Sequence, residues 1–136
     1  MGLMIMALAL VGASATNGAI AAEIATPTML ISGGISDSDY PKAARDAGVE
    51  GATIMRLLVS SKGEVTECQI ARSSGSALLD QKSCAIWIGF RYKPARDASG
   101  KKVEQWVQES IAWTIGTPCT AFPKSGMGIC VTASKR

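Results

Sequence analysis

GEVTECQIARSSGSALLDQKSCAIWIGFRYKPA, residues 63–95, is the stretch that decides the fold of this 136-residue chain. Its first part alternates between polar and apolar side chains, which predicts a strand over residues 64–73. A break of serines and one glycine follows, and its hydroxyl groups are expected to cap a helix that begins near Ala77, with Asp80 in the first turn. The chain then leaves the helix in an extended form. This stretch therefore already contains a sheet layer with a helix to cover it.

Two further strands are expected around this stretch. Residues 51–60 alternate in hydrophobicity, and the turn at Ser61-Lys62-Gly63 can pair them antiparallel with the next strand because its glycine accepts a positive φ. Residues 103–115 are rich in β-forming side chains and predict a long third strand. Further upstream, Pro41 and Gly48 frame a short helix. The mixture of strands and helices is typical of the α+β class.

The alternation in the third strand is imperfect. Gln105 and Glu109 share a face with Val107 and Ile111, so polar and apolar side chains would point to the same side. One explanation is a β-bulge near Glu109 and Ser110. The other is a strand at the sheet edge with one exposed side.

Composition excludes several classes of function. The chain contains no histidine, so it lacks Ser-His and Cys-His nucleophile pairs and the commonest transition-metal ligand. Its 11 carboxylates are scattered among polar neighbours, and no pair lies in an apolar setting that would separate their pKa values. The net charge of +3 is spread along the chain, whereas nucleic-acid binding needs a concentrated basic face. We expect one domain that is not an enzyme, binds no nucleic acid and holds no cofactor or metal.

The N-terminal residues resemble a targeting segment. Residues 1–22 carry no charged side chain, and an apolar run over residues 3–11 precedes small residues, which is typical of a cleaved secretory signal peptide. A retained membrane helix is the alternative, but its polar residues and glycines make it a poor span. Residues 23–38 are short and polar and are expected to form a flexible lead. Export would place the protein in the periplasm, with membrane contact only through an uncleaved N-terminus.

Four cysteines without a C-x-x-C motif favour two structural disulfides in an exported protein. Three pairings are formally possible. The local pairing joins Cys68 to Cys84 and Cys119 to Cys130, and each bridge would contribute roughly 3 kcal/mol in the chain-entropy model. The first bridge would pin the helix to the sheet, and the second would close the tail, residues 117–136, as a hairpin or loop. Buried free thiols are the alternative.

A set of short motifs occurs in an order and spacing typical of one family: Tyr40, Pro41, Gly51, Gly63, Ser73, Ser74, Gly75, Leu79, Asp80, Pro94 and Ala95. With these motifs the sequence resembles the C-terminal domain of the TonB family over about residues 40–115. The resemblance implies a three-stranded antiparallel sheet with two helices on one face, here within residues 39–116. It also implies that the fold brings Cys68 and Cys84 close together.

The resemblance further implies binding rather than catalysis. TonB domains contact the TonB box peptide of outer-membrane receptors and transmit force from an inner-membrane motor. Such binding adds a strand to an exposed sheet edge. The candidate edge on this chain consists of Gln105, Trp106, Val107, Gln108, Glu109, Ser110 and Ile111. Val107, Ile111 and Trp113 are equally candidates for the core.

Three functions follow as hypotheses. The first is a periplasmic module of TonB-dependent transmembrane transport that binds an extended peptide or the sheet edge of an envelope protein. The second is a secreted, disulfide-braced protein of the cell envelope that forms a homodimer through the same edge. The third is a membrane-anchored energy transducer with an uncleaved N-terminus. For this third function the chain departs from the family pattern of a long spacer, because only about sixteen residues, roughly 55 Å when extended, separate the apolar segment from the domain.

Overall fold

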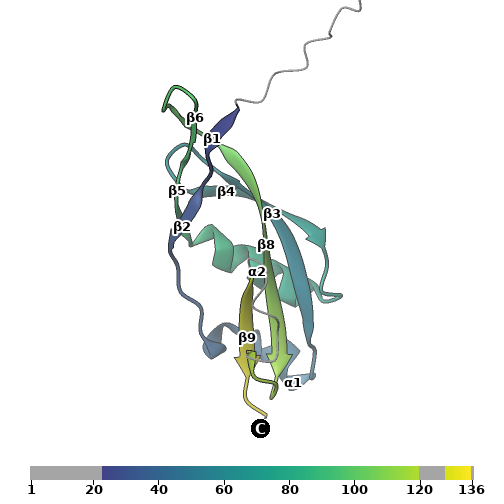
Figure 1. Cartoon of the computed structure of the whole chain (residues 1–136). Helices are drawn as coiled ribbons and strands as arrows, with labels where there is room; N and C mark the ends of the chain where they lie inside the picture. The colour runs from purple at the N-terminus through teal and green to yellow at the C-terminus, as the bar shows by residue number, and fades with distance from the viewer. Residues whose placement is uncertain (1–22, 120–127, 136) are drawn as a thin grey trace, which may run out of the picture.

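A computed structural model describes residues 23–119 and 128–135 (Figure 1). The predicted signal peptide, residues 1–22, lies outside the described residues. The described chain contains strands and a few helices. Their order is β1 (Ile24–Thr26), β2 (Met29–Ser32), the 3-10 helix η1 (Asp37–Asp39), α1 (Lys42–Asp46), β3 (Gly51–Val59), β4 (Val65–Arg72), α2 (Ala77–Ile88), β5 (Arg91–Lys93), β6 (Ala95–Asp97), β7 (Lys102–Val103), β8 (Gln105–Ile115) and β9 (Ile129–Ala133).

The main sheet has four strands in the order β4-β3-β8-β9. β3 pairs antiparallel with β4 on one side and with β8 on the other. β9 lies on the far side of β8 and runs parallel to it, from the Ile111–Ile129 pair to the Ile115–Ala133 pair. The prediction of three strands is therefore wrong in strand number, because the tail adds a fourth strand, the parallel β9. The α+β class and the antiparallel arrangement of the first three strands are confirmed.

The tail joins the sheet instead of folding on itself. β9 is parallel to β8, so the two strands do not form a hairpin, which requires antiparallel neighbours. The apolar side of β9 explains this position, because Val131 is buried in the core beside Trp113, its partner on β8. The disulfide between Cys119 and Cys130 ties the tail at the same place. The Cys119–Cys130 bridge predicted for the tail is thus confirmed, and the tail contributes the parallel strand β9 in place of a hairpin.

The N-terminal lead is also part of the structure. We predicted a flexible segment over residues 23–38, but β1 pairs with β6 and β2 pairs with β5, both antiparallel. β6 pairs in turn with β7, so β1, β6 and β7 form a small separate sheet. Figure 1 shows these short strands at the end of the main sheet where β8 begins. The lead therefore borders the first half of β8.

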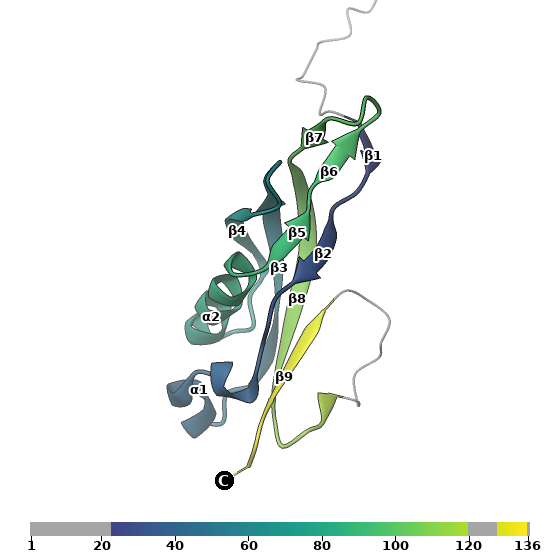
Figure 2. The same ribbon diagram turned by 90° about the vertical axis from the view of Figure 1, so that its left-hand side faces the viewer.

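Both helices cover one face of the main sheet (Figure 2), as the family resemblance implied. The core fills the space between them. The Cys68–Cys84 disulfide, with a Cα–Cα distance of 5.8 Å, joins β4 to α2 across this space and confirms the first predicted bridge. The buried core residues of the central elements are Met55, Leu57 and Val59 of β3, Leu79, Ile86 and Trp87 of α2, Ile111 and Trp113 of β8, and Val131 and Ala133 of β9.

Asp80 organises the start of α2. Its Oδ1 accepts hydrogen bonds from Thr53 Oγ1 at 2.9 Å and from the backbone N–H and hydroxyl of Ser74 at 2.9 and 2.7 Å. Its Oδ2 accepts from the Ser73 hydroxyl, and Ser76 is the N-cap whose side chain accepts a first-turn N–H. Burial raises the pKa of Asp80, but these hydrogen bonds outweigh burial and hold it below the ordinary value. The predicted capping role of the serines is confirmed.

Gly63 shows why one family motif requires glycine. Its φ is +80°, in the region that other residues avoid. A Cβ at this position would lie 1.9 Å from the carbonyl oxygen of Tyr92. The Gly63 carbonyl also accepts the Tyr92 N–H at 2.9 Å, so the turn packs directly against β5. Tyr92 is thereby held with its side chain toward the interior, where it is 4% exposed.

Candidate functional site

The first half of β8 is an open sheet edge. On one flank β8 pairs with β3 from the Gly51–Trp113 pair to the Val59–Gln105 pair without a register shift. On the other flank β9 covers only Ile111 onward. Gln105–Glu109 therefore has no strand partner on this flank within the described residues. In such a ladder alternate residues direct their N–H and C=O groups away from the paired strand. Those groups are available here to a further strand.

Two predictions about this strand need correction. The unbroken register with β3 rules out a bulge near Glu109 and Ser110. Ile111, which we placed on the open edge, lies where β9 begins and is 0% exposed. Ile111 and Trp113 are core residues, whereas Val107 is only partly buried against the core. Ser110, next to Ile111, lies against Gly128, which immediately precedes the tail strand β9, so the open edge, Gln105–Glu109, is two residues shorter than the predicted one.

Side chains of the open edge alternate between the two faces of the sheet. Trp106 lies on the face away from the helices, is 37% exposed and packs its ring 5.1 Å from the Arg56 guanidinium carbon. Gln105, Val107 and Glu109 point to the opposite face, which carries the helices. The edge therefore presents an exposed aromatic side and a more enclosed side.

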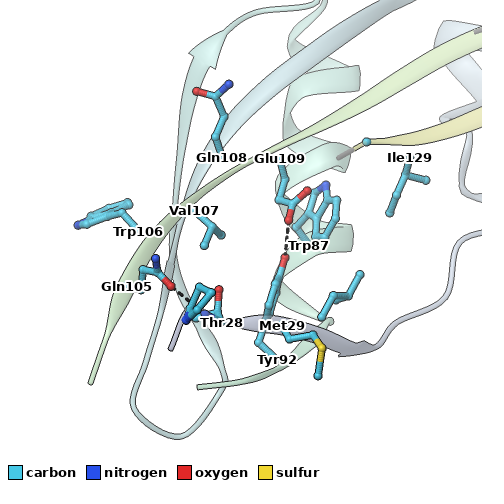
Figure 3. Close-up of a pocket in the computed structure, with 13 residues that line it drawn as sticks. Thr28, Met29, Trp87, Tyr92, Gln105, Trp106, Val107, Gln108, Glu109 and Ile129 are labelled. Carbon is cyan, nitrogen blue, oxygen red and sulfur yellow. Dashed lines mark hydrogen bonds between the residues drawn. The ribbon is translucent and has the colours of Figure 1, made fainter. Parts of the chain in front are cut away.

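A pocket of ≈ 600 Å³ lies on the enclosed side (Figure 3). Five parts of the chain form it: β2 with the two residues before it, α2, β5, the open edge of β8 and the start of β9. Most of the lining side chains are apolar. The lining residues are Pro27, Thr28, Met29, Leu30, Trp87, Tyr92, Gln105, Trp106, Val107, Gln108, Glu109, Gly128 and Ile129.

Three polar side chains meet inside this apolar lining. The Tyr92 hydroxyl donates a hydrogen bond to Glu109 Oε1 at 3.2 Å, and Glu109 is only 7% exposed. Burial raises the pKa of Glu109, although the Tyr92 hydrogen bond opposes this change. Burial and the neighbouring carboxylate also raise the pKa of Tyr92. Trp87 Nε1 is buried and has no hydrogen-bond partner in the described part of the protein. Figure 3 shows all three groups pointing toward one another.

The rim of the pocket is held in place by a hydrogen bond between the lead and the open edge. The backbone N–H of Thr28 donates to Gln105 Oε1 at 2.8 Å. β2 follows Thr28, and Met29 and Leu30 are 59% and 43% exposed although they are apolar. The lead thus supplies an apolar wall opposite β8. Sequence reasoning missed this wall because the lead was expected to be flexible.

Replacing Glu109 with glutamine is expected to stabilise the protein at neutral pH by about 1 kcal/mol, since a neutral side chain is less costly to bury. Folding raises the pKa of Glu109, so the carboxyl contributes most to stability below its unfolded pKa and loses this contribution as the pH rises through the folded value. The stabilisation of the Glu109→Gln variant over the natural protein should therefore vanish near about pH 3 and be complete near pH 7.

Denaturant unfolding at both pH values measures this effect. Glu104→Gln, which neutralises an exposed carboxylate next to the same strand, is the matched control and should change little at either pH. A Glu109→Gln variant less stable than the natural protein at pH 7 would contradict the expectation.

The other long edge of the main sheet is less suited to pairing. The outer flank of β4 has no strand partner within the described residues, and an isolated bridge between Glu64 and Arg91 lies just before the strand begins. The pairing of β4 with β3 contains two register shifts, one near each end. Bulges of this kind twist an edge strand and discourage further pairing. The regular edge of β8 is therefore better suited than β4 to main-chain pairing with an added strand.

The family motif residues lie mostly in structural positions. The Tyr40 hydroxyl donates to the Val49 carbonyl, and its ring meets Trp113 edge-on at 5.3 Å. Leu79 and Ala95 are both 0% exposed. The motif thus positions the sheet and α2 rather than lining the pocket. Metal-binding clusters of three or more His, Cys, Asp or Glu residues are absent from the described ranges. Nor do these ranges contain a helix with the length and apolar character to span a membrane.

Comparisons with known proteins agree with this architecture. The protein tonB2 of Pseudomonas aeruginosa is 34% identical over 74 residues, which make up 54% of this chain and 27% of that protein. The chain thus spans only a minor part of that relative's length. The solution NMR structure of the Pseudomonas aeruginosa TonB CTD matches with a TM-score of 0.54 at 20% identity, covering 67% of this chain and 89% of that one, and supports the fold. The family model of the Gram-negative bacterial TonB protein C-terminal matches residues 36–115, so the chain belongs to this family.

Proposed function

We propose that this protein is a periplasmic binding module of TonB-dependent transport that captures an extended peptide by strand addition. The peptide would pair with the open edge of β8, Gln105–Glu109. One observation carries the proposal: at Gln105–Glu109 this strand, regularly paired with β3 on its other flank, has no strand partner within the described residues. An extended peptide satisfies such an edge with main-chain hydrogen bonds, and pockets for alternate side chains supply selectivity.

Family membership supports a binding role. TonB C-terminal domains act in energy transduction and protein interaction without enzymatic chemistry, and TonB proteins are envelope-associated and interact with outer-membrane receptors. A receptor's TonB box is therefore the first peptide to test. The proposal also includes export, with cleavage near Ala22 or Glu23. A mass spectrum of the protein from its native envelope that retained residues 1–22 would favour the anchored transducer instead.

Titration of the ¹⁵N-labelled protein with a TonB box peptide is expected to shift the amide resonances of Gln105–Glu109. A backbone N–H that gains a hydrogen bond changes its chemical environment strongly, whereas amides of the paired region should change little. A peptide of the same sequence with N-methyl groups on alternate residues is the control, because it cannot complete the ladder and should bind at least tenfold more weakly. Each peptide is added to protein shown by light scattering to be monomeric.

Other outcomes would contradict the proposal. Shifts confined to β4 would place binding at the opposite edge of the sheet. Equal binding of the methylated and unmethylated peptides would show that no ladder forms. A free protein that is dimeric, with Gln105–Glu109 protected from hydrogen exchange, would mean that a second copy of the chain occupies the edge.

A further inference from the structure

The polar groups inside the pocket are incompletely paired. Trp87 is 1% exposed, and its Nε1–H has no acceptor among the described residues, which is costly for a buried donor. Glu109 accepts from Tyr92 through Oε1, and a carboxylate has the capacity to accept further hydrogen bonds. A buried donor without an acceptor and a carboxylate with remaining acceptor capacity therefore line the same pocket (Figure 3).

A strand added to β8 would direct side chains into this space. β9 pairs with β8 from Ile111 onward, so an added strand opposite Gln105–Glu109 would continue the line of β9. Residues paired across a ladder place their side chains on the same face of the sheet. Peptide side chains opposite Val107 and Glu109 would therefore enter the pocket, and those opposite Trp106 and Gln108 would lie on the outer face.

These two groups discriminate among the side chains that could enter. An apolar side chain leaves the Trp87 N–H without an acceptor and gives Glu109 no further donor. An ammonium group can donate to Glu109 but cannot accept from Trp87. A carboxylate can accept from Trp87 but repels Glu109 when both are ionised. A primary carboxamide meets both needs, because its oxygen accepts and its nitrogen donates.

We propose that the pocket between β2, α2 and β8 selects a carboxamide side chain, Asn or Gln, from the extended peptide bound at the open edge. Trp87 donates to the amide oxygen and Glu109 accepts from the amide nitrogen. Apolar contacts with Met29, Val107 and Ile129 surround the stem of the side chain. This inference rests on the proposed strand addition and names the chemical class of the recognised residue.

A panel of peptides tests the selection. The probe is a capped peptide of alternating threonine and valine, with one central valine replaced by Gln, Asn, Met, Lys or Glu. Isothermal titration calorimetry gives the affinity, and the amide shifts of Gln105–Glu109 report binding at the edge. The better carboxamide peptide is expected to bind about tenfold more tightly than the Met peptide, with Lys and Glu weaker still. Moving the carboxamide by one residue should abolish the gain, and moving it by two should restore it at least in part.

Protein variants assign the preference to the two groups. Glu109→Gln should raise the affinity for the Glu peptide at least tenfold relative to the Gln peptide, because the repelling charge is gone. Trp87→Phe should remove most of the preference for a carboxamide over Met. The matched control is Trp113→Phe, which also removes a buried indole from the core but lies outside the pocket. It should lower stability and leave the preference intact.

The outcomes separate this inference from the function on which it rests. If all peptides shift the edge amides with equal affinity, strand addition stands and the carboxamide selection is wrong. A Lys peptide that binds most tightly would also overturn the selection, because charge alone would then decide. If no peptide shifts the edge amides, both proposals are wrong. A preference that is lost equally in Trp87→Phe and Trp113→Phe would reject the assigned role of Trp87.

Discussion

Trp113→Ala is expected to lower the free energy of unfolding by about 3–5 kcal/mol, the range for truncating a buried large aromatic side chain. Trp113 is 0% exposed, and its Nε1 donates to Ser83 Oγ at 3.0 Å, which in turn donates to the Leu79 carbonyl at 2.7 Å. The ring also packs edge-on against Tyr40. Alanine would leave a cavity between β8 and α2. It would also remove the indole N–H that donates a hydrogen bond to Ser83 Oγ. Denaturant unfolding monitored by far-UV circular dichroism measures the loss.

The matched control is Trp106→Ala on the same strand. Trp106 is 37% exposed and its one resolved ring contact is with Arg56, so its truncation should cost less than about 1 kcal/mol. The two variants thus separate the buried and exposed faces of β8. Similar losses for both variants would mean that the described orientation of the strand is wrong.

Replacing Cys119 and Cys130 with serine is expected to destabilise the protein by roughly 3 kcal/mol, because the bridge closes a short loop and restricts the unfolded chain. The effect should also be local. The disulfide joins the second residue of β9 to Cys119, just beyond the end of β8, and β9 pairs with β8 over five residues, so without the bridge the amides of Ile111–Ile115 should exchange faster with solvent. Hydrogen exchange followed by NMR, together with thermal unfolding, measures both effects.

The Cys68→Ser, Cys84→Ser variant is the comparison for this experiment. Its bridge spans 16 residues, so the global cost should again be roughly 3 kcal/mol. The accelerated exchange should now appear in β4 and α2, which that bridge connects. Unchanged protection of Ile111–Ile115 in the Cys119 and Cys130 variant would show that strand pairing alone holds β9.

Strong local patterns made much of the fold predictable. The alternation in β3 and β4, the turn at Gly63 and the capping serines before α2 each determine a local conformation by their own chemistry. The disulfide pairs followed from the small sequence separations and from the facing strand and helix. These features depend on residues that are close in sequence, which a single sequence displays directly.

The missed strands depend on distant partners. β9 contains five residues, and nothing in its own pattern specifies that it pairs parallel to β8. The Cys119–Cys130 bridge was the available signal, since it fixes the tail near the end of β8. β1 and β2 are short and mostly exposed and flank Pro27, so they form only because β5 and β6 lie beside them. Tertiary context decides such strands.

The candidate site was partly predictable for the same reason. The family resemblance pointed to residues 105–111 as the candidate edge, and the structure leaves Gln105–Glu109 of this segment without a strand partner on one flank of the described sheet. The pocket was not predicted, because Trp87, Tyr92 and Met29 come from three separate elements. Glu109 already stood out as a carboxylate on the apolar side of its strand. A bulge and an exposed side of an edge strand were the two explanations for this position, whereas the structure buries Glu109 against Tyr92.

β9 also sets a limit on anything that docks at the neighbouring edge. It begins at Ile129, beside Ile111, and occupies the lane that an incoming segment would follow. If a peptide adds to this edge as proposed, it can pair with only about five positions of β8, a run of roughly 17 Å. Beyond that point it has to turn out of the plane of the sheet. Under the proposal β9 thus limits the length of the segment that pairs, and the peptide residues outside that segment are expected to vary freely.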